Sequence, residues 1–145
     1  MAEKKKKIVI YNNGITMDGQ ITILMNILKN LDSSKYDIIL LILADFGKEN
    51  VSLPLLPDHV KINFLPLASL INKFYYYKGI KRNLFKKLYY NYLIWRLATE
   101  SRKQCVKYIN EIRKQNGEID VFIDFDGGTR RYIDKIKSNQ KINFL

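Results

Sequence analysis

Two glycine-bearing loops hold the residues of this sequence that are best suited to contact a ligand. The candidate residues in these loops are Asn13, Gly14, Asp18, Gly19, Asp126, Gly127, Gly128 and Thr129. Glycine lets a backbone approach a ligand closely, and free amides at the start of a helix attract phosphate groups. Because each loop follows an apolar run and precedes a helical pattern, we predict that both loops face one cleft. Glycines after strands are also typical of ordinary turns, so either loop alone has a purely structural explanation.

The first loop lacks the common phosphate-binding signatures. No Gly-Lys-Ser/Thr follows it, which excludes a Walker loop, and the third glycine of the dinucleotide fingerprint is missing. Asp126 in the second loop has an alternative explanation, as a charge that complements a helix dipole. The single cysteine, Cys105, excludes a cysteine-based zinc site and an internal disulfide, so we expect it to pack within a helix. We assign no metal site and no catalytic residue, and we do not expect one at the only histidine, His59.

The elements that must position these loops follow from the apolar pattern. Short apolar runs predict strands at residues 7–11, 36–44, 60–65, 119–125 and 141–145. Helical patterns lie between them, at residues 18–31, 68–116 with a break at Gly79 and a cap at Gly117, and 129–138. We expect the first helix to bury one broad face, made of Ile21, Ile23, Leu24, Ile27, Leu28 and Leu31. Alternation of strands and helices predicts a Rossmann-like α/β fold, a parallel sheet of about five strands flanked by helices.

Length and hydropathy indicate one domain inside the cell. The 145 residues suffice for one core and are too few for two. No stretch of the sequence is apolar enough to span a membrane, and the apolar run behind Lys4–Lys7 is too short for an export signal. We therefore predict a cytoplasmic domain covering residues 1–145. Because the sequence stops inside a predicted strand, we expect it to be truncated, with a further domain missing.

Positive charge is concentrated in one aromatic segment. The formal net charge is +11, and seven bases with no acid lie between Lys73 and Arg96. The residues that we assign to a membrane or acceptor surface are Lys73, Lys78, Lys81, Arg82, Lys86, Lys87, Trp95 and Arg96. Leu84, Leu88 and Tyr92 share a helical stripe with Trp95, as in a helix that lies on an anionic membrane. The alternatives are a core helix with solvated lysines and, less favoured because no known motif is present, a nucleic-acid-binding surface.

Several short motifs, taken in order, resemble the family 4 glycosyltransferases of bacteria, which have the GT-B fold. The motifs are Lys6-Lys7-Ile8-Val9-Ile10, Asp18-Gly19-Gln20-Ile21-Thr22-Ile23-Leu24, Leu56-Pro57-Asp58-His59-Val60-Lys61 and Asp120-Val121-Phe122-Ile123-Asp124-Phe125-Asp126-Gly127-Gly128. The resemblance implies the N-terminal, acceptor-side half of such an enzyme, with the two loops lining the cleft near the acceptor or the donor diphosphate. The chain departs from the family pattern at Asp18, where the family has its first glycine, and a carboxylate there would repel a diphosphate.

The resemblance also implies the partners of the full-length protein. A nucleotide-sugar donor would bind to a C-terminal domain that this chain lacks, so we expect no cofactor in this part and no activity from it alone. The acceptor would be a glycan or a lipid-linked sugar for the cell envelope, met at the inner face of the membrane. Two alternatives stay open: a stand-alone Rossmann-like or flavodoxin-like module that binds a nucleotide or phosphate, and a basic nucleic-acid-binding protein.

Overall fold

The strands of this chain form a parallel sheet, as the apolar pattern predicts. A computed structural model describes residues 4–14, 19–45, 47, 50, 52–79 and 83–144. Within these residues the sheet has five strands in the order β3-β2-β1-β4-β5, and every neighbouring pair is parallel. The strands are β1 (Lys6–Asn12), β2 (Tyr36–Ile42), β3 (Val60–Phe64), β4 (Val121–Asp124) and β5 (Gln140–Asn143). The chain therefore has the Rossmann-like α/β fold that the sequence predicts.

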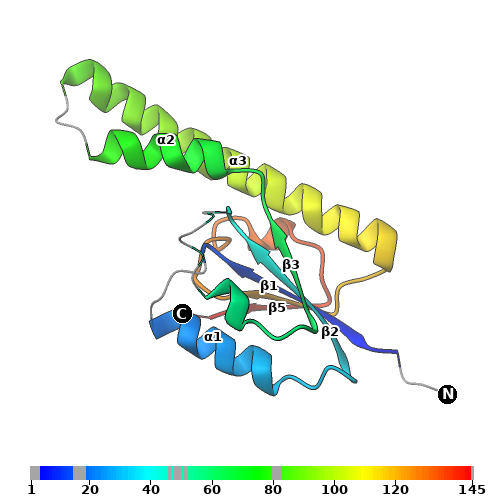
Figure 1. Cartoon of the computed structure of the whole chain (residues 1–145). Helices are drawn as coiled ribbons and strands as arrows, with labels where there is room; N and C mark the ends of the chain where they lie inside the picture. The colour runs from blue at the N-terminus through cyan, green and yellow to red at the C-terminus, as the bar shows by residue number, and fades with distance from the viewer. Residues whose placement is uncertain are drawn as a thin grey trace.

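Side chains that alternate along the central strands divide the core into two layers. Val9 and Tyr11 of β1 point into one layer, while Ile8 and Ile10 point into the other. Both layers are buried, which explains why β1 and β2 are almost continuously apolar. The long helix α3 (Leu84–Asn116) covers the first layer and α1 (Gly19–Asn30) covers the second, on opposite faces of the sheet (Figure 1).

The buried face of α1 is narrower than the sequence analysis predicted. Ile21, Leu24 and Leu28 are buried as expected, and Met25 joins them. Ile23 is 51% exposed, so its assignment to this face was wrong. At 100° per residue, Ile23 lies on the side of the helix away from Ile21 and Met25. A helix that packs Ile21 and Met25 against the sheet therefore leaves Ile23 exposed.

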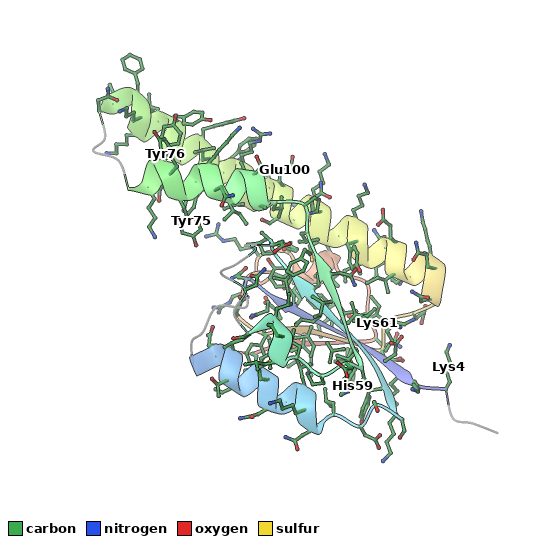
Figure 2. The ribbon with its side chains drawn as sticks, in the orientation of Figure 1. Lys4, His59, Lys61, Tyr75, Tyr76 and Glu100 are labelled. Atoms are coloured by element: carbon green, nitrogen blue, oxygen red, sulfur yellow. The ribbon has the colours of Figure 1, made fainter. Side chains whose placement is uncertain are left out.

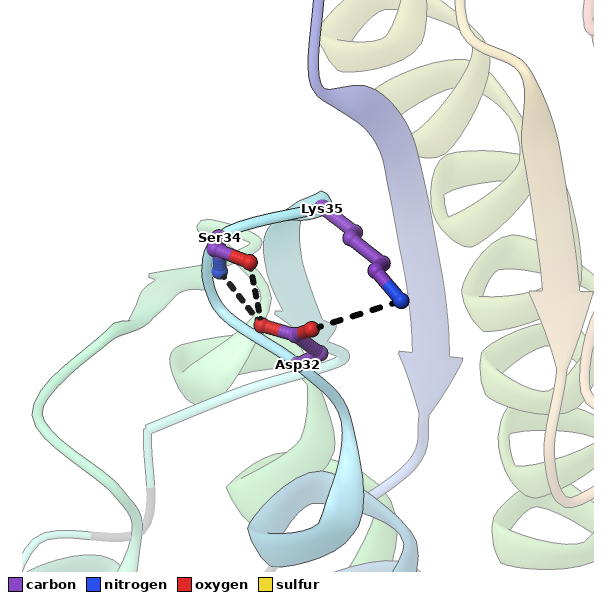
Figure 3. A network of polar contacts seen from close by, with 3 residues as sticks. All are labelled: Asp32, Ser34 and Lys35. Atoms are coloured by element: carbon purple, nitrogen blue, oxygen red, sulfur yellow. Dashed lines mark hydrogen bonds and ion pairs between the residues drawn. The ribbon is translucent and has the colours of Figure 1, made fainter. Parts of the chain in front are cut away.

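A polar turn ends α1 and turns the chain into β2 (Figure 3). Asp32 accepts hydrogen bonds from the amide and the hydroxyl of Ser34, at 2.8 and 2.6 Å, and Lys35 forms an ion pair with it at 3.7 Å. The hydrogen bonds from Ser34 lower the pKa of Asp32.

The connection from β2 to β3 lies on the α1 side of the core. It contains the short helix η2 (Leu53–Leu55) and then leads directly to β3 at the edge of the sheet.

The helices after β3 form a hairpin that extends past the sheet. α2 (Ala68–Lys78) and α3 flank the break predicted at Gly79. The side chain of Asn83 caps the start of α3 by accepting from the Lys86 amide at 3.0 Å. Gly117 ends α3 with a φ of 83°, which confirms its predicted role as a cap. The second half of α3 lies on the sheet. The first turns of α2 pack against the core at Ile71, and the rest of α2 and the first half of α3 project beyond the strands (Figure 1).

The predicted helix at residues 129–138 is wrong. The chain forms turns there, followed by the single 3-10 turn η3 (Ile133–Lys135). Thr129 is fully buried and donates to the Asp124 carboxylate through both its amide and its hydroxyl, at 2.8 and 2.7 Å. These hydrogen bonds fix Thr129 against the end of β4, and the residues that follow form turns. The connection from β4 to β5 therefore covers less of the sheet than a helix would.

The edge of the sheet at which the strands begin holds Lys7 and His59. The Lys7 ammonium is buried and donates to the carbonyl oxygen of Asn116, at the end of α3, where a cation complements the helix dipole. The amide of Lys7 donates to Asp120 at 2.8 Å, which ties β1 to the start of β4. His59 is exposed just before β3 (Figure 2). It thus lies at the opposite edge from the two glycine-bearing loops, away from any cleft that they form.

Candidate functional site

The two glycine-bearing loops meet because the strands that precede them are neighbours. β1 and β4 pair in parallel, so their carboxyl ends reach the same edge of the sheet. The amide of Asn13 donates to Asp126 Oδ2 at 2.5 Å, and the amide of Gly128 donates to Asp126 Oδ1 at 3.2 Å. The prediction that both loops share one edge is therefore confirmed. Asp18, which belongs to the first loop, lies outside the described residues.

Asp126 joins the two loops, because each of its carboxylate oxygens accepts a hydrogen bond from a backbone amide. Burial raises the pKa of this carboxyl, and the amide hydrogen bonds from Asn13 and Gly128 offset part of that effect. The alternative explanation for Asp126, as a charge at a helix start, was wrong, since turns follow it. The arrangement is that of a carboxylate that fixes two loops relative to each other.

The glycines of the site differ in what the structure requires of them. Gly127 has a φ of 75°, a backbone conformation that other residues rarely adopt. A Cβ on Gly128 would lie 2.6 Å from Tyr11 Cε1 and 2.8 Å from Asn13 Oδ1, so only glycine fits between the loops. A Cβ on Gly19 would meet nothing within 4 Å. The carbonyl oxygen of Gly14 accepts from the side chain of Asn12 at 2.5 Å, which shapes the start of the first loop.

Beneath the two loops lies a second, buried polar cluster. Asp124 and Thr129 are fully buried and bonded to each other, so Thr129 supports the loop and does not line its surface. The Tyr11 hydroxyl donates to Asn13 Oδ1 at 3.2 Å, and burial raises its pKa well above the ordinary value. Tyr132 and Cys105 are buried next to this cluster, and burial also raises their pKa values. The predicted packing role of Cys105 is confirmed.

A large groove opens at this edge of the sheet and continues along α3. Its volume is about 1230 Å³, and it runs between one flank of α3 and the connection from β4 to β5. Among the residues that the sequence analysis singled out, Asn13, Gly128 and Trp95 line it. The β4–β5 connection, which forms turns and η3 where a longer helix was expected, contributes Arg131, Tyr132 and Lys135 to the lining opposite α3.

The lining of the groove changes in character along α3. Phe74, Ile94 and Trp95 make one part apolar. Basic side chains dominate the rest, and these are Arg102, Lys103, Lys107, Lys114, Arg131 and Lys135. Glu111 is the acid of the lining and forms a 4.0 Å ion pair with Lys107. Such a surface suits a ligand that has an anionic or hydroxyl-rich part and an apolar or sugar-ring face.

The sequence analysis missed the basic residues of this groove. Lys103 and Lys107 are four residues apart on one helix face, a spacing that was readable from the sequence. Arg131 and Lys135 come from the β4–β5 connection, which was expected to be an α-helix. Their position opposite α3 depends on the tertiary fold and had no local signal.

The basic aromatic segment lies on the α2–α3 hairpin, and its apolar stripe is exposed. Leu84, Leu88, Tyr92 and Trp95 are 69%, 58%, 45% and 63% exposed, so the interpretation of this stripe as core was wrong. The five basic residues assigned to this surface that the structure describes are also exposed: Lys73, Lys78, Lys86, Lys87 and Arg96. Lys81 and Arg82 lie outside the described residues.

No described helix is both long and apolar enough to cross a membrane. The described residues also contain no group of three histidine, cysteine or acidic side chains that could hold a metal ion.

Comparison with known proteins identifies the fold. No protein-family model and no curated protein matches the chain. The apo structure of Phytolacca americana UGT2 matches with a TM-score of 0.57 and 20% identity, over 96% of this chain and 29% of that one. The structure of the same protein complexed with UDP-2fluoro-glucose and pterostilbene matches with a TM-score of 0.57 and 19% identity, over 99% and 31%. The chain thus spans less than a third of these proteins, and it has the Rossmann-like fold of one half of a GT-B UDP-glycosyltransferase.

Proposed function

We propose that this chain is the acceptor-binding half of a glycosyltransferase with the GT-B fold, and that the groove along α3 holds the acceptor. The observation that carries the proposal is the position of this groove. It opens at the carboxyl edge of a parallel sheet, where α/β proteins bind their ligands, and two loops joined by Asp126 border it. The similarity of the fold to part of UGT2 supports the choice of a glycosyltransferase as the enzyme class.

The chemistry of the groove fits a glycan or a lipid-linked sugar. Arg102 and Arg131 supply planar donors for hydroxyl or phosphate oxygens, and Asn13 adds an amide. Trp95 offers an aromatic face on which a sugar ring or an isoprenoid chain can lie. In this proposal the motifs that resemble family 4 enzymes reflect a common acceptor-side half, working at the inner face of a membrane.

The donor belongs to another part of the protein in this proposal. The solved UGT2 complex contains UDP-2fluoro-glucose. We assign a nucleotide-sugar donor to a second, C-terminal domain, and residues 1–145 to the N-terminal domain that presents the acceptor. The isolated chain is then expected to bind acceptor without transferring a sugar.

The test is a titration of the isotope-labelled chain, followed by NMR chemical shifts. One series uses oligosaccharides and a short-chain prenyl diphosphate sugar, and the other uses UDP-glucose. We expect shifts around Asn13 and Gly128 with the acceptor series, weakened by Arg131→Ala. The matched control is Lys29→Ala, a basic residue on α1, which covers the other face of the sheet.

Two results would count against the proposal. Tight binding of UDP-glucose or free UDP by this chain alone would favour the alternative of a stand-alone nucleotide-binding module. Acceptor-induced shifts confined to residues outside the groove would also contradict it, because the proposed site would then be unused.

A further inference from the structure

The α2–α3 hairpin carries more exposed apolar surface than its own packing requires. The two helices are held together by aromatic pairs: Phe74 stacks on Tyr90 at 5.4 Å between ring centroids, and Tyr77 meets Tyr89 edge-on at 4.8 Å. These contacts account for the inner side of the hairpin. They leave a second apolar surface on its outer side.

This outer surface, called here the hairpin stripe, consists of Leu84, Phe85, Leu88, Tyr92 and Trp95 on α3. Phe85, in the first turn of α3, is 79% exposed. Tyr75 and Tyr76 of α2 are exposed on the same projecting part of the molecule (Figure 2). Single exposed apolar residues are ordinary, but a contiguous stripe of this kind marks a surface that contacts a partner.

Basic side chains flank the hairpin stripe. On the helical wheel of α3, Lys87 lies on one side of the stripe and Arg96 on the other, and both are exposed. Leu93, on the side away from Leu84 and Trp95, is fully buried, so the stripe lies on the side of α3 opposite to its buried side. No acidic residue occurs between Lys73 and Arg96 to neutralise these cations.

We propose that the hairpin stripe docks on an anionic lipid bilayer, with its apolar side chains among the acyl chains and its flanking cations at the phosphates. Leucine, phenylalanine and tryptophan on one face with lysine and arginine beside them is the arrangement of a helix that lies in the membrane interface. A membrane accounts for both the apolar and the basic residues. A second copy of this chain would bring like charges together, and a nucleic acid would leave Leu84 and Leu88 exposed. The inference does not depend on what the groove binds. Trp95 is shared by the two proposals, whereas Leu84, Phe85, Leu88 and Tyr92 belong to the hairpin stripe and do not line the groove.

The single tryptophan of the chain makes the test site-specific. Because Trp95 is the only tryptophan, the emission of the protein reports on this one position, at the end of the hairpin stripe where it also borders the groove. We expect vesicles of phosphatidylcholine with phosphatidylglycerol to shift this emission to shorter wavelength and to sediment the protein. Lipids brominated along the acyl chains should quench the emission. Vesicles of phosphatidylcholine alone should bind much less, and salt should weaken binding to the anionic ones.

Paired variants separate the two parts of the proposed contact. Lys87→Gln with Arg96→Gln should lower the partition coefficient for anionic vesicles by roughly 10- to 30-fold, from the usual contribution of each basic residue near an anionic surface. Leu84→Ser with Leu88→Ser should abolish the emission shift. The matched control is Ile23→Ser, an apolar residue 51% exposed on α1, which should bind as the native protein does.

Three outcomes would overturn the proposal. Sedimentation without a change in Trp95 emission would mean that another surface binds the lipid. A concentration-dependent emission shift without lipid, together with a dimer in ultracentrifugation, would assign the stripe to a second copy. Tighter binding to RNA than to anionic vesicles at the same ionic strength would assign the cations to nucleic acid.

Discussion

Replacing Gly128 by alanine tests whether close packing of the two loops builds the candidate site. The added Cβ would lie 2.6 Å from Tyr11 Cε1 and 2.8 Å from Asn13 Oδ1, where ordinary contacts are 3.4–4 Å. Tyr11 is 1% exposed, and its ring packs in the core layer between the sheet and α3. It therefore cannot move aside without disturbing this layer. Asn13 can rotate only by losing the hydrogen bond from the Tyr11 hydroxyl. Both routes of relief therefore cost stability.

We expect Gly128→Ala to lower the free energy of unfolding by about 2 kcal/mol, within the range for an overpacked core site. For a domain of this size that corresponds to a fall in Tm of roughly 6 °C. The matched control is Gly19→Ala, where the new methyl meets nothing within 4 Å at the start of α1. Alanine there favours the helix, so its Tm should be unchanged or raised by a few degrees, from a gain of at most about 1 kcal/mol.

The assay is thermal and urea denaturation of both variants, followed by circular dichroism. A Gly128→Ala protein that melts with the native one, or above the Gly19→Ala protein, would refute the argument, because the loops would not be packed as described. A destabilised Gly128→Ala protein that still binds acceptor with native affinity would show that the packing of the loops is not needed for binding in the groove.

Three further predictions concern the polar groups around the site. Thr129→Val keeps the side-chain volume but removes a buried donor to Asp124, and should lower the free energy of unfolding by about 1.5–3 kcal/mol in urea denaturation; a loss below about 0.5 kcal/mol would contradict this hydrogen bond. Burial raises the pKa of Asp126 above its ordinary 3.8, so the folded protein binds more protons than the unfolded chain just above that pH and loses stability as the pH rises. In urea denaturation, the free energy of unfolding of Asp126→Asn should therefore increase relative to that of the native protein as the pH rises through this window. A difference between the two proteins that does not change with pH would contradict the assigned burial of Asp126. Burial raises the pKa of the Cys105 thiol to about 12, so Ellman's reagent at about pH 8 should label it quickly only after unfolding, and fast native labelling would show that α3 leaves the sheet.

The sheet was predictable because its central strands have no polar face. Residues 7–11 and 36–44 are apolar on both sides, and only strands covered on both faces allow that pattern. The break at Gly79 and the cap at Gly117 were predictable too, since glycine is the residue that helix ends favour.

The failures have a common physical cause, which is competition between local and tertiary interactions. Residues 129–138 have a helical pattern, yet Thr129 is tied to a buried Asp124, and Tyr132, Ile133 and Ile136 pack into the core from turns. The apolar stripe at Leu84 and Leu88 has the composition of a core, and only the projection of the hairpin past the sheet reveals that it is exposed.

A single continuous helix, α3, joins the hairpin stripe to the groove. A helix of 33 residues is a rod of roughly 50 Å without a joint, and the same rod bears the hairpin stripe at one end and a wall of the groove further along. From Leu88 to Arg102 the axial rise is about 21 Å. Any tilt imposed at the outer end is thus transmitted to the groove wall, and a proline placed between these positions would decouple the two.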